Sequence, residues 1–282
     1  MINFTKAHAC GNDFLIILED DVSGYDYAEL ARRLCARTTS IGADGIEFFA
    51  WAGAKTGAKT GPRSGRIRLH NADGSIAEIS GNGTRCVAAW MANELNAQPG
   101  DTLEIVTDAG PRLCEINALD ESAGFTVEVT TGMGIPSFQP HTLSLGSGVR
   151  IDGTLVSTGN PHFVIAVDNA EFAVAGKTWQ TIGAEICIHR DFPRQTNVEF
   201  VRVLNPAEIE IRIFERGVGP TTSSGTGTSA SATAARAFLN CKSPLTVFAQ
   251  GGAQTVVWEG PGAPLQLIGP ASLIARGEAF QA

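Results

Sequence analysis

Two short motifs of the same form decide the fold: Ser80-Gly81-Asn82-Gly83-Thr84 and Ser224-Gly225-Thr226-Gly227-Thr228. They stand 144 residues apart, and each opens a stretch rich in alanine and other small residues. A second pair, Gly11-Asn12-Asp13-Phe14 and Gly159-Asn160-Pro161-His162-Phe163, follows the same order at an offset of 148 residues. Several matches at nearly one offset predict an internal repeat. The alternative is coincidence among the loops of a glycine-rich chain.

The repeat predicts two homologous halves of similar size. We expect an N-terminal half over residues 1–131, to which the tail 273–282 returns, and a C-terminal half over 132–272. The length of 282 residues also suggests two domains.

Within each half the patterns predict both strands and helices. Apolar and charged residues alternate with period two at 209–213, as in a half-buried strand. β-Branched content predicts further strands at 103–107, 126–129, 163–167, 198–204, 245–249 and 255–259. Strands outnumber helices and do not alternate strictly with them, which favours an α+β fold with antiparallel sheet.

Three helices and one loop complete the expected elements. Apolar spacing predicts a helix over 27–36. Small residues predict central, buried helices over 84–95 and 228–239. A duplicated Gly-Ala-Lys-Thr predicts an exposed loop over 50–65.

Composition narrows the class of protein. The formal net charge of −8 argues against a general nucleic-acid binder, which carries basic patches. No apolar run reaches 18 residues, and we expect neither a membrane span nor a signal peptide. Six scattered cysteines without a CxxC pair indicate the reducing cytoplasm, and neither a disulfide scaffold nor a zinc site.

Each Ser-Gly-x-Gly turn runs directly into a predicted helix. Backbone N–H groups at a helix start, approached over glycine, form an anion site. The simpler interpretation is that Ser80 and Ser224 are ordinary N-caps. The matched pair favours a ligand site, in which two helix ends grip one carboxylate. A dinucleotide site is disfavoured because residues 225–230 lack a preceding buried strand and a following acidic residue.

Taken in order, the motifs resemble the diaminopimelate epimerase family. The resemblance covers residues 3 to about 230, and its motifs are specific as a set although each is weak alone. It rests on residues 4–14, 42–45, 71–75, 81–86, 159–162, 196–198 and 215–219.

The resemblance implies two pseudo-symmetric α+β domains, each a barrel-like, mostly antiparallel sheet around a central helix, with the active site in the cleft between them. It implies a cytoplasmic isomerase, an amino-acid racemase that inverts one α-carbon of a diamino diacid in lysine biosynthesis. It implies no cofactor, no metal, no nucleic-acid or membrane partner, a small amino-acid substrate, and a homodimer.

The resemblance also assigns roles to residues. The catalytic positions are Ser80 and Ser224, with His162 and Glu215 as polar neighbours that steer the acid/base pair. The implied substrate-binding residues are Asn12, Asn71, Gly81, Asn82, Asn160, Asn197, Glu215, Arg216, Gly225 and Thr226. Taken one by one, these are ordinary turn or core residues.

The chain departs from the family at the two residues that matter most. The family uses two cysteines as acid and base, and this chain has Ser80 and Ser224 in their places. A hydroxyl is a far weaker acid than a thiol and needs an activating base. Three explanations stay open. The first is deliberate Cys→Ser changes, and the second is a related hydroxy-amino-acid epimerase or dehydratase, or another isomerase, of the same fold. The third is that the serines work slowly or that the protein only binds its ligand. Cys10 and Cys86 are weak substitutes.

Overall fold

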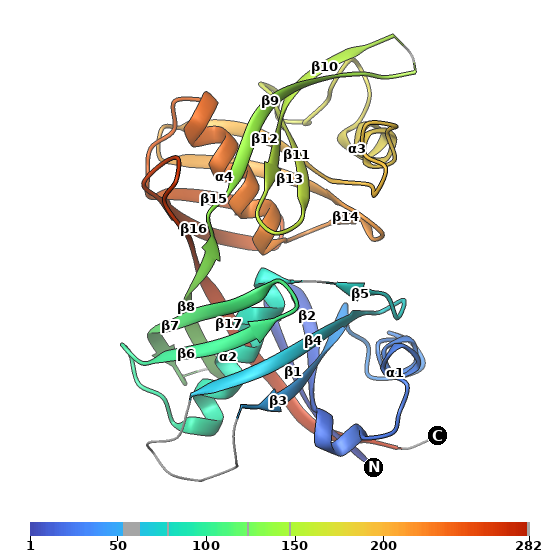
Figure 1. The fold of residues 1–282 in the computed structure, drawn as a ribbon, viewed down its shortest axis with the longest axis vertical. Helices are drawn as coiled ribbons and strands as arrows, with labels where there is room; N and C mark the ends of the chain where they lie inside the picture. Colours follow the sequence, from blue (N-terminus) through green and yellow to red (C-terminus); the bar gives the residue numbers. More distant parts are fainter. Residues whose placement is uncertain (53–62, 78, 123, 147, 281–282) are drawn as a thin grey trace. The chain divides into compact units, whose positions relative to one another are not determined.

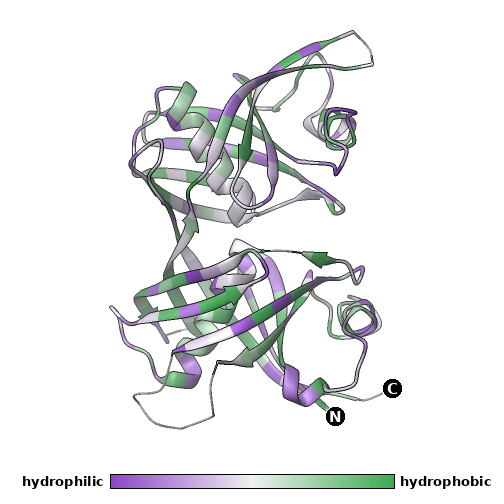
Figure 2. Ribbon diagram, viewed as in Figure 1, coloured by the Kyte–Doolittle hydropathy of each residue, from purple (hydrophilic) through white to green (hydrophobic). Residues whose placement is uncertain are grey.

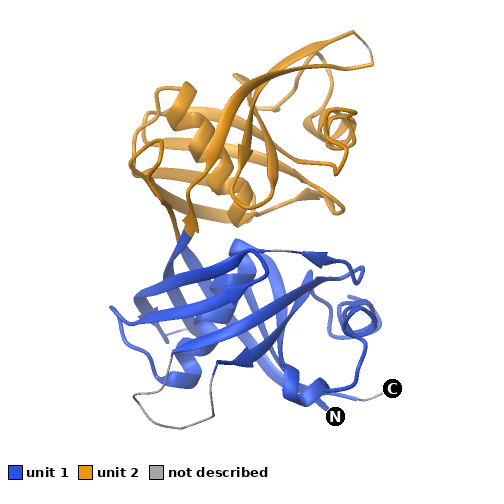
Figure 3. Ribbon diagram, viewed as in Figure 1, with its two compact units in different colours: residues 1–132, 269–282 blue, residues 133–268 orange. Residues whose placement is uncertain are grey.

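The computed structural model of the chain describes residues 1–52, 63–77, 79–122, 124–146 and 148–280 (Figure 1). Strands dominate it, and each of two helices is enclosed by a strand ladder. The chain divides into two compact units, residues 1–132 with 269–282, and residues 133–268 (Figure 3). The predicted α+β class is confirmed.

Unit 1 is a closed ring of strands with a helix inside. The ladder runs β1–β2–β3–β4–β6–β7–β8–β17 and closes where β17 pairs with β1. Most pairs are antiparallel, while β2–β3 and β4–β6 are parallel. The elements are β1 (Ile2–Ala9), β2 (Asn12–Leu18), η1 (Glu19–Val22), α1 (Tyr27–Leu34), β3 (Gly45–Trp51), β4 (Ser64–Asn71), β5 (Ile76–Ala77), α2 (Gly81–Leu95), β6 (Thr102–Thr107), β7 (Gly110–Asp120), β8 (Phe125–Gly134) and β17 (Leu265–Ala279).

Unit 2 has the same order of parallel and antiparallel strand pairs. Its ladder runs β9–β10–β11–β12–β13–β15–β16–β17, with β11–β12 and β13–β15 parallel. Its elements are β9 (Ser137–Ser144), β10 (Arg150–Ser157), β11 (Pro161–Ala166), α3 (Trp179–Cys187), β12 (Asn197–Asn205), β13 (Glu208–Glu215), β14 (Gly219–Thr221), α4 (Gly225–Phe238), β15 (Leu245–Ala249) and β16 (Gly252–Trp258).

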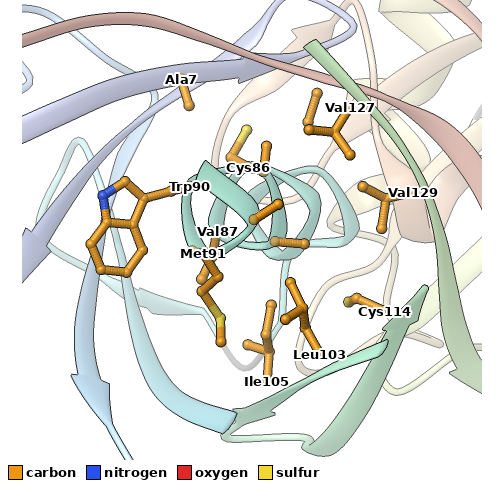
Figure 4. Packing of buried hydrophobic residues seen from close by; sticks show 14 of the residues in the cluster. Ala7, Cys86, Val87, Trp90, Met91, Leu103, Ile105, Cys114, Val127 and Val129 are labelled. Carbon is orange, nitrogen blue, oxygen red and sulfur yellow. The ribbon is translucent and has the colours of Figure 1, made fainter. Parts of the chain in front are cut away.

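The central helices are buried nearly all round, as the small-residue pattern predicted. In α2 every residue from Gly81 to Ala92 is buried, and in α4 every residue from Gly225 to Ala235. Around α2, Val87, Trp90 and Met91 pack against strand residues of the same cluster (Figure 4). Along β13, buried and less buried residues alternate, and hydrophobic and hydrophilic residues alternate with them (Figure 2).

The predicted elements are present, with shifted ends. Helix α1 stops at Leu34 instead of 36, and α2 and α4 each begin three residues earlier than predicted, at Gly81 and Gly225. The interpretation of Ser80 and Ser224 as N-caps is confirmed, and each helix begins at the residue after its cap. The expected loop over 50–65 is wrong at its ends, because Ala50 and Trp51 pair with the first residues of β4. Its residues 53–62 lie outside the described chain.

No described helix has both the length and the apolar character needed to cross a membrane.

Candidate functional site

Each central helix begins at a serine whose side chain caps it. Ser80 Oγ accepts from the Gly83 N–H over 3.0 Å, and Ser224 Oγ accepts from the Gly227 N–H over 3.1 Å. Both serines have extended backbones, with φ of −126° and −150°, as N-cap residues do. An α-helix leaves its first N–H groups without intrahelical partners, so both helix starts are suited to an anion.

In unit 1 a chain of side-chain hydrogen bonds orients Asn82 in the first turn of α2. Asn12 Nδ2 donates to Asp44 Oδ2 over 2.6 Å, and Asn82 Nδ2 donates to Asn12 Oδ1 over 3.1 Å. Arg85, with no exposed surface, donates to Asn82 Oδ1 over 2.7 Å. Three predicted residues, Asn12, Ser80 and Asn82, are thus gathered at the start of α2.

The turn that carries Asn12 is held by charge. Asp13 forms ion pairs with Lys6 at 3.0 Å and with Arg37 at 2.7 Å, and Arg37 also pairs with Asp44 at 2.6 Å. Burial raises the pKa of Asp13, but the hydrogen bonds from Arg37 and Lys6 outweigh it and hold that pKa below its ordinary value. Arg37 bridges Asp13 and Asp44, and this holds Asp44 beside Asn12.

Asn71 is less closely connected to this group. Its Nδ2 donates to Ser75 Oγ over 3.0 Å, and its backbone N–H donates to the Ser75 carbonyl over 2.8 Å. These contacts close the turn between β4 and β5. None of the described hydrogen bonds of Asn71 joins it to Ser80 or Asn82, so its role as a substrate contact stays a prediction.

In unit 2 a chain of polar contacts leads from Ser224 to a buried glutamate. Ser224 Oγ lies 3.4 Å from Thr226 Oγ1, and Asn160 Nδ2 donates to Thr226 Oγ1 over 3.3 Å. Asn160 Oδ1 lies 2.8 Å from His162 Nε2, and His162 Nδ1 lies 2.7 Å from Glu199 Oε1. Four of the predicted residues are therefore brought together, and their chain ends at a group that was not predicted.

The same chain defines where its protons lie. Because the Asn160 amide nitrogen donates to Thr226, its oxygen faces His162 Nε2, which must carry a hydrogen. Two acceptors do not face each other at 2.7 Å, so a second proton lies between His162 Nδ1 and Glu199. Burial raises the pKa of Glu199, against the opposing charge of His162. The two side chains, both fully buried, thus share one proton away from water.

Asn197 and Arg216 form a second group in unit 2. Asn197 Oδ1 accepts from the Arg216 backbone N–H over 2.9 Å, while its Nδ2 donates to the Pro161 carbonyl over 3.2 Å. The half-buried Arg216 donates from Nη1 to the Arg194 carbonyl over 3.2 Å. Glu215, also half-buried, ends β13 directly before Arg216.

A cavity adjoins both groups. Its volume is about 520 Å³, and Asn160, His162, Arg194 and Thr196 are among its lining residues. Asn160 and His162 belong to the chain that ends at Glu199, and Arg194 supplies the carbonyl that binds Arg216. Unit 2 therefore offers space for a small polar ligand beside the predicted residues.

The remaining cysteines do not form an obvious acid/base pair. Cys86 has no exposed surface, and burial raises the pKa of its thiol far above the ordinary value. Cys10 lies in the turn between β1 and β2, with 6% of its surface exposed and a left-handed φ of 51°. Cys86 is packed in the core, as the sequence indicated.

Two buried glutamates, Glu47 and Glu199, escaped the sequence analysis although each lies against a capped helix. A Cβ on Gly83 would stand 1.9 Å from Glu47 Oε1, and a Cβ on Gly227 would stand 2.8 Å from Glu199 Oε1. The third residue of each helix, Gly83 or Gly227, must therefore be glycine, because a buried carboxyl group fills the space that a side chain would need.

A sequence signal for them existed. Ile46-Glu47-Phe48-Phe49 and Val198-Glu199-Phe200-Val201 share one pattern, a single charge inside an apolar strand, in corresponding strands of the two halves. A charge at a core position breaks the strand pattern, and such breaks are typical of functional sites.

Comparison with known proteins gives one family. The family model described as diaminopimelate epimerase matches residues 4–138 and 154–274. A diaminopimelate epimerase from Halorhodospira halophila is 34% identical over 289 residues, which cover 98% of this chain and 94% of that protein.

Two solved structures share the fold at low sequence identity. A probable proline racemase from Agrobacterium radiobacter has a TM-score of 0.71 at 14% identity, covering 100% of this chain and 94% of that one. A hydroxyproline epimerase from Agrobacterium vitis has a TM-score of 0.67 at 16% identity, and the match covers 98% of this chain and 90% of that one.

The Glu47 carboxyl predicts how stability depends on pH. Burial, reinforced by the charge of Asp108, raises its pKa from 4.5 to about 8. The folded chain therefore keeps a proton that the unfolded chain releases, and the free energy of unfolding falls as pH rises from about 5 to 8. One pKa unit corresponds to about 1.4 kcal/mol. Between about pH 5 and pH 8, the free energy of unfolding of the parent should therefore fall by a few kcal/mol relative to that of Glu47→Gln.

Urea unfolding of the parent and of Glu47→Gln at pH 5 and pH 8 measures this difference. Exposed Glu115, changed to Gln, is the control and should follow the parent at both pH values. Parallel pH dependence of the parent and Glu47→Gln would show that the carboxyl does not hold its proton.

Proposed function

The chain belongs to the diaminopimelate epimerase family, and we propose that it inverts one α-carbon of a diamino diacid without a cofactor. The observation that carries the proposal is the matched pair of serine-capped helix starts, each lying against a buried carboxyl group. Epimerisation needs one group to remove the α-proton and another to return a proton, and the repeated chain supplies two equivalent groups.

The helix starts suit the charge that develops during the reaction. When the α-proton leaves, negative charge spreads onto the substrate carboxylate. Oriented N–H groups of Gly81, Asn82, Gly225 and Thr226 would stabilise this charge, and they need no reorganisation to do so. The hydrogen bonds that fix Asn82 through Asn12 and Arg85 support this role for unit 1.

We assign the acid and base roles to Ser80 and Ser224. A serine hydroxyl removes a proton only with the help of an adjacent base. In the chain through Thr226 and Asn160, the hydrogens of His162 and Asn160 point toward Ser224, so the chain orients the serine and stabilises negative charge on its oxygen. His162 and Glu199 are positioning residues in this proposal, since they act through the serine. Glu215 is a further polar neighbour of the pair.

The distal end of a diamino diacid carries a carboxylate and an amino group, which a cation and side-chain amides can bind. A planar guanidinium binds both oxygens of a carboxylate, and Arg216 is supported through its own backbone by Asn197. We propose that Arg216, Asn197 and Asn160 hold the distal group, with Asn71 as a further contact. By the same resemblance we propose a cytoplasmic role in lysine biosynthesis and a homodimer.

Deuterium uptake tests the chemistry. In D₂O, diaminopimelate incubated with the chain should gain deuterium at an α-carbon, and Ser80→Ala or Ser224→Ala should slow the uptake by about a hundredfold or more. Ser231→Ala is the matched control, because this buried hydroxyl lies deeper in α4 and has no hydrogen-bond partner among the described residues. Absence of uptake by the parent contradicts the proposal, and a keto product indicates a lyase.

Arg216→Leu tests the distal contact. The variant should fold normally and lose about tenfold to a hundredfold in affinity for diaminopimelate, the free energy of a charged, two-oxygen hydrogen bond. Calorimetric titration measures the affinity, and Arg190→Leu, an exposed arginine of unit 2, is the control. Undiminished affinity in a folded variant would remove Arg216 from the site.

A further inference from the structure

Glu47 is a carboxyl group in a place where the fold needs none. Its surface is 0% exposed, and neither carboxyl oxygen has a hydrogen-bond partner in the part of the chain that the structure describes. Its neighbours in register are apolar, Ile16 on β2 and Leu69 on β4. An isolated buried carboxyl is costly, and an apolar residue would pack at this position without that cost. Stability therefore does not explain Glu47.

The surroundings of Glu47 keep it protonated at neutral pH. Burial disfavours the charged form, the negative Asp108 after β6 adds to this, and together they raise the pKa to about 8. From α2 the titratable neighbour is the buried Cys86 thiol. The charge of Asp13 on β2 is already taken up by Lys6 and Arg37.

The carboxyl lies beside the residue that caps α2. The point that a Gly83 Cβ would occupy is 1.9 Å from Glu47 Oε1 and 3.2 Å from Ser80 Cβ. The carboxyl and the serine thus flank one small space at the helix start. Ser80 itself is half-buried, whereas Glu47 is enclosed.

The equivalent place in unit 2 shows what such a carboxyl can do. The point of a Gly227 Cβ is 2.8 Å from Glu199 Oε1 and 3.2 Å from Ser224 Oγ. There the carboxyl shares a proton with His162, which partly opposes the rise in pKa that burial causes. Glu47 has no described partner of this kind. The two serines are therefore backed by carboxyl groups whose hydrogen-bond surroundings differ, one paired with a histidine and one without a described partner.

We propose that Glu47 is the proton store of Ser80, a positioning residue that supplies and takes back the proton that Ser80 exchanges with the substrate. This inference rests on the proposed epimerase function. The transfer requires Ser80 Oγ to turn from the Gly83 N–H toward the carboxyl, across the space that both flank. In that position, as the substrate carbanion takes the proton of Ser80 Oγ, the Glu47 carboxylic acid gives its own proton to the same oxygen. The C–H and new O–H bonds form, the two old O–H bonds break, and the negative charge ends on Glu47. The reverse transfer restores the acid when Ser80 removes an α-proton.

The first test does not depend on turnover. In Ser80→Cys, alkylation of the introduced thiol by iodoacetamide is mapped by mass spectrometry across pH, against the six buried native cysteines. Groups that share a proton titrate together, so adding Glu47→Gln should move the midpoint by about one pH unit or more. Glu47→Asp should restore the original midpoint, and the exposed control Glu115→Gln should leave it unchanged.

The second test uses the parent reaction. Deuterium uptake by the parent should fall above about pH 8, where Glu47 loses its proton, and Glu47→Gln should abolish this step and lower the rate about a hundredfold. An unmoved alkylation midpoint overturns the inference, whatever the rate. A coupled midpoint without uptake by the parent supports the proton store and contradicts the proposed function instead.

Discussion

The candidate site in each half is built on one hydrogen bond, from a glycine N–H back to the serine hydroxyl three residues earlier. It sets where each buried helix begins, and it turns the first N–H groups toward the place where a ligand carboxylate is expected. The same turn requires glycine at its third position, because a buried glutamate occupies the side-chain space. Cap, glycine and glutamate are thus one unit of structure, repeated in each half.

This unit bears on the proposal that a hydroxyl acts at each helix start, where the resemblance implies a thiol. A thiolate at a helix start is stabilised by the helix dipole alone, whereas a hydroxyl needs a partner that holds or gives a proton. Both serines have a carboxyl group nearby. Glu199 shares its proton with His162, and Glu47 keeps its own because burial and the charge of Asp108 disfavour the carboxylate. The two halves therefore share one fold, but the carboxyl groups behind their serines have different hydrogen-bond surroundings.

The sequence predicted the repeat, the α+β class, the two central helices and the family, because these depend on local patterns and on ordered motifs. It placed the starts of α2 and α4 three residues too late, because those bounds rested on the runs of small residues and not on the N-cap serines. It also missed Glu47 and Glu199, because burial of a charge depends on which strand faces which helix. Asn71 shows the opposite case, a motif residue whose described hydrogen bonds stay within its own turn.

The central claim is that Ser80 and Ser224 occupy the acid and base positions of this family's site. The most direct measurement is α-hydrogen exchange of diaminopimelate by Ser80→Cys/Ser224→Cys beside the parent chain. Thiols at both helix starts should exchange the hydrogen faster than the two hydroxyls, because a thiol is by far the stronger acid. If the double variant folds and exchanges no faster than the parent, the two helix starts do not carry the chemistry.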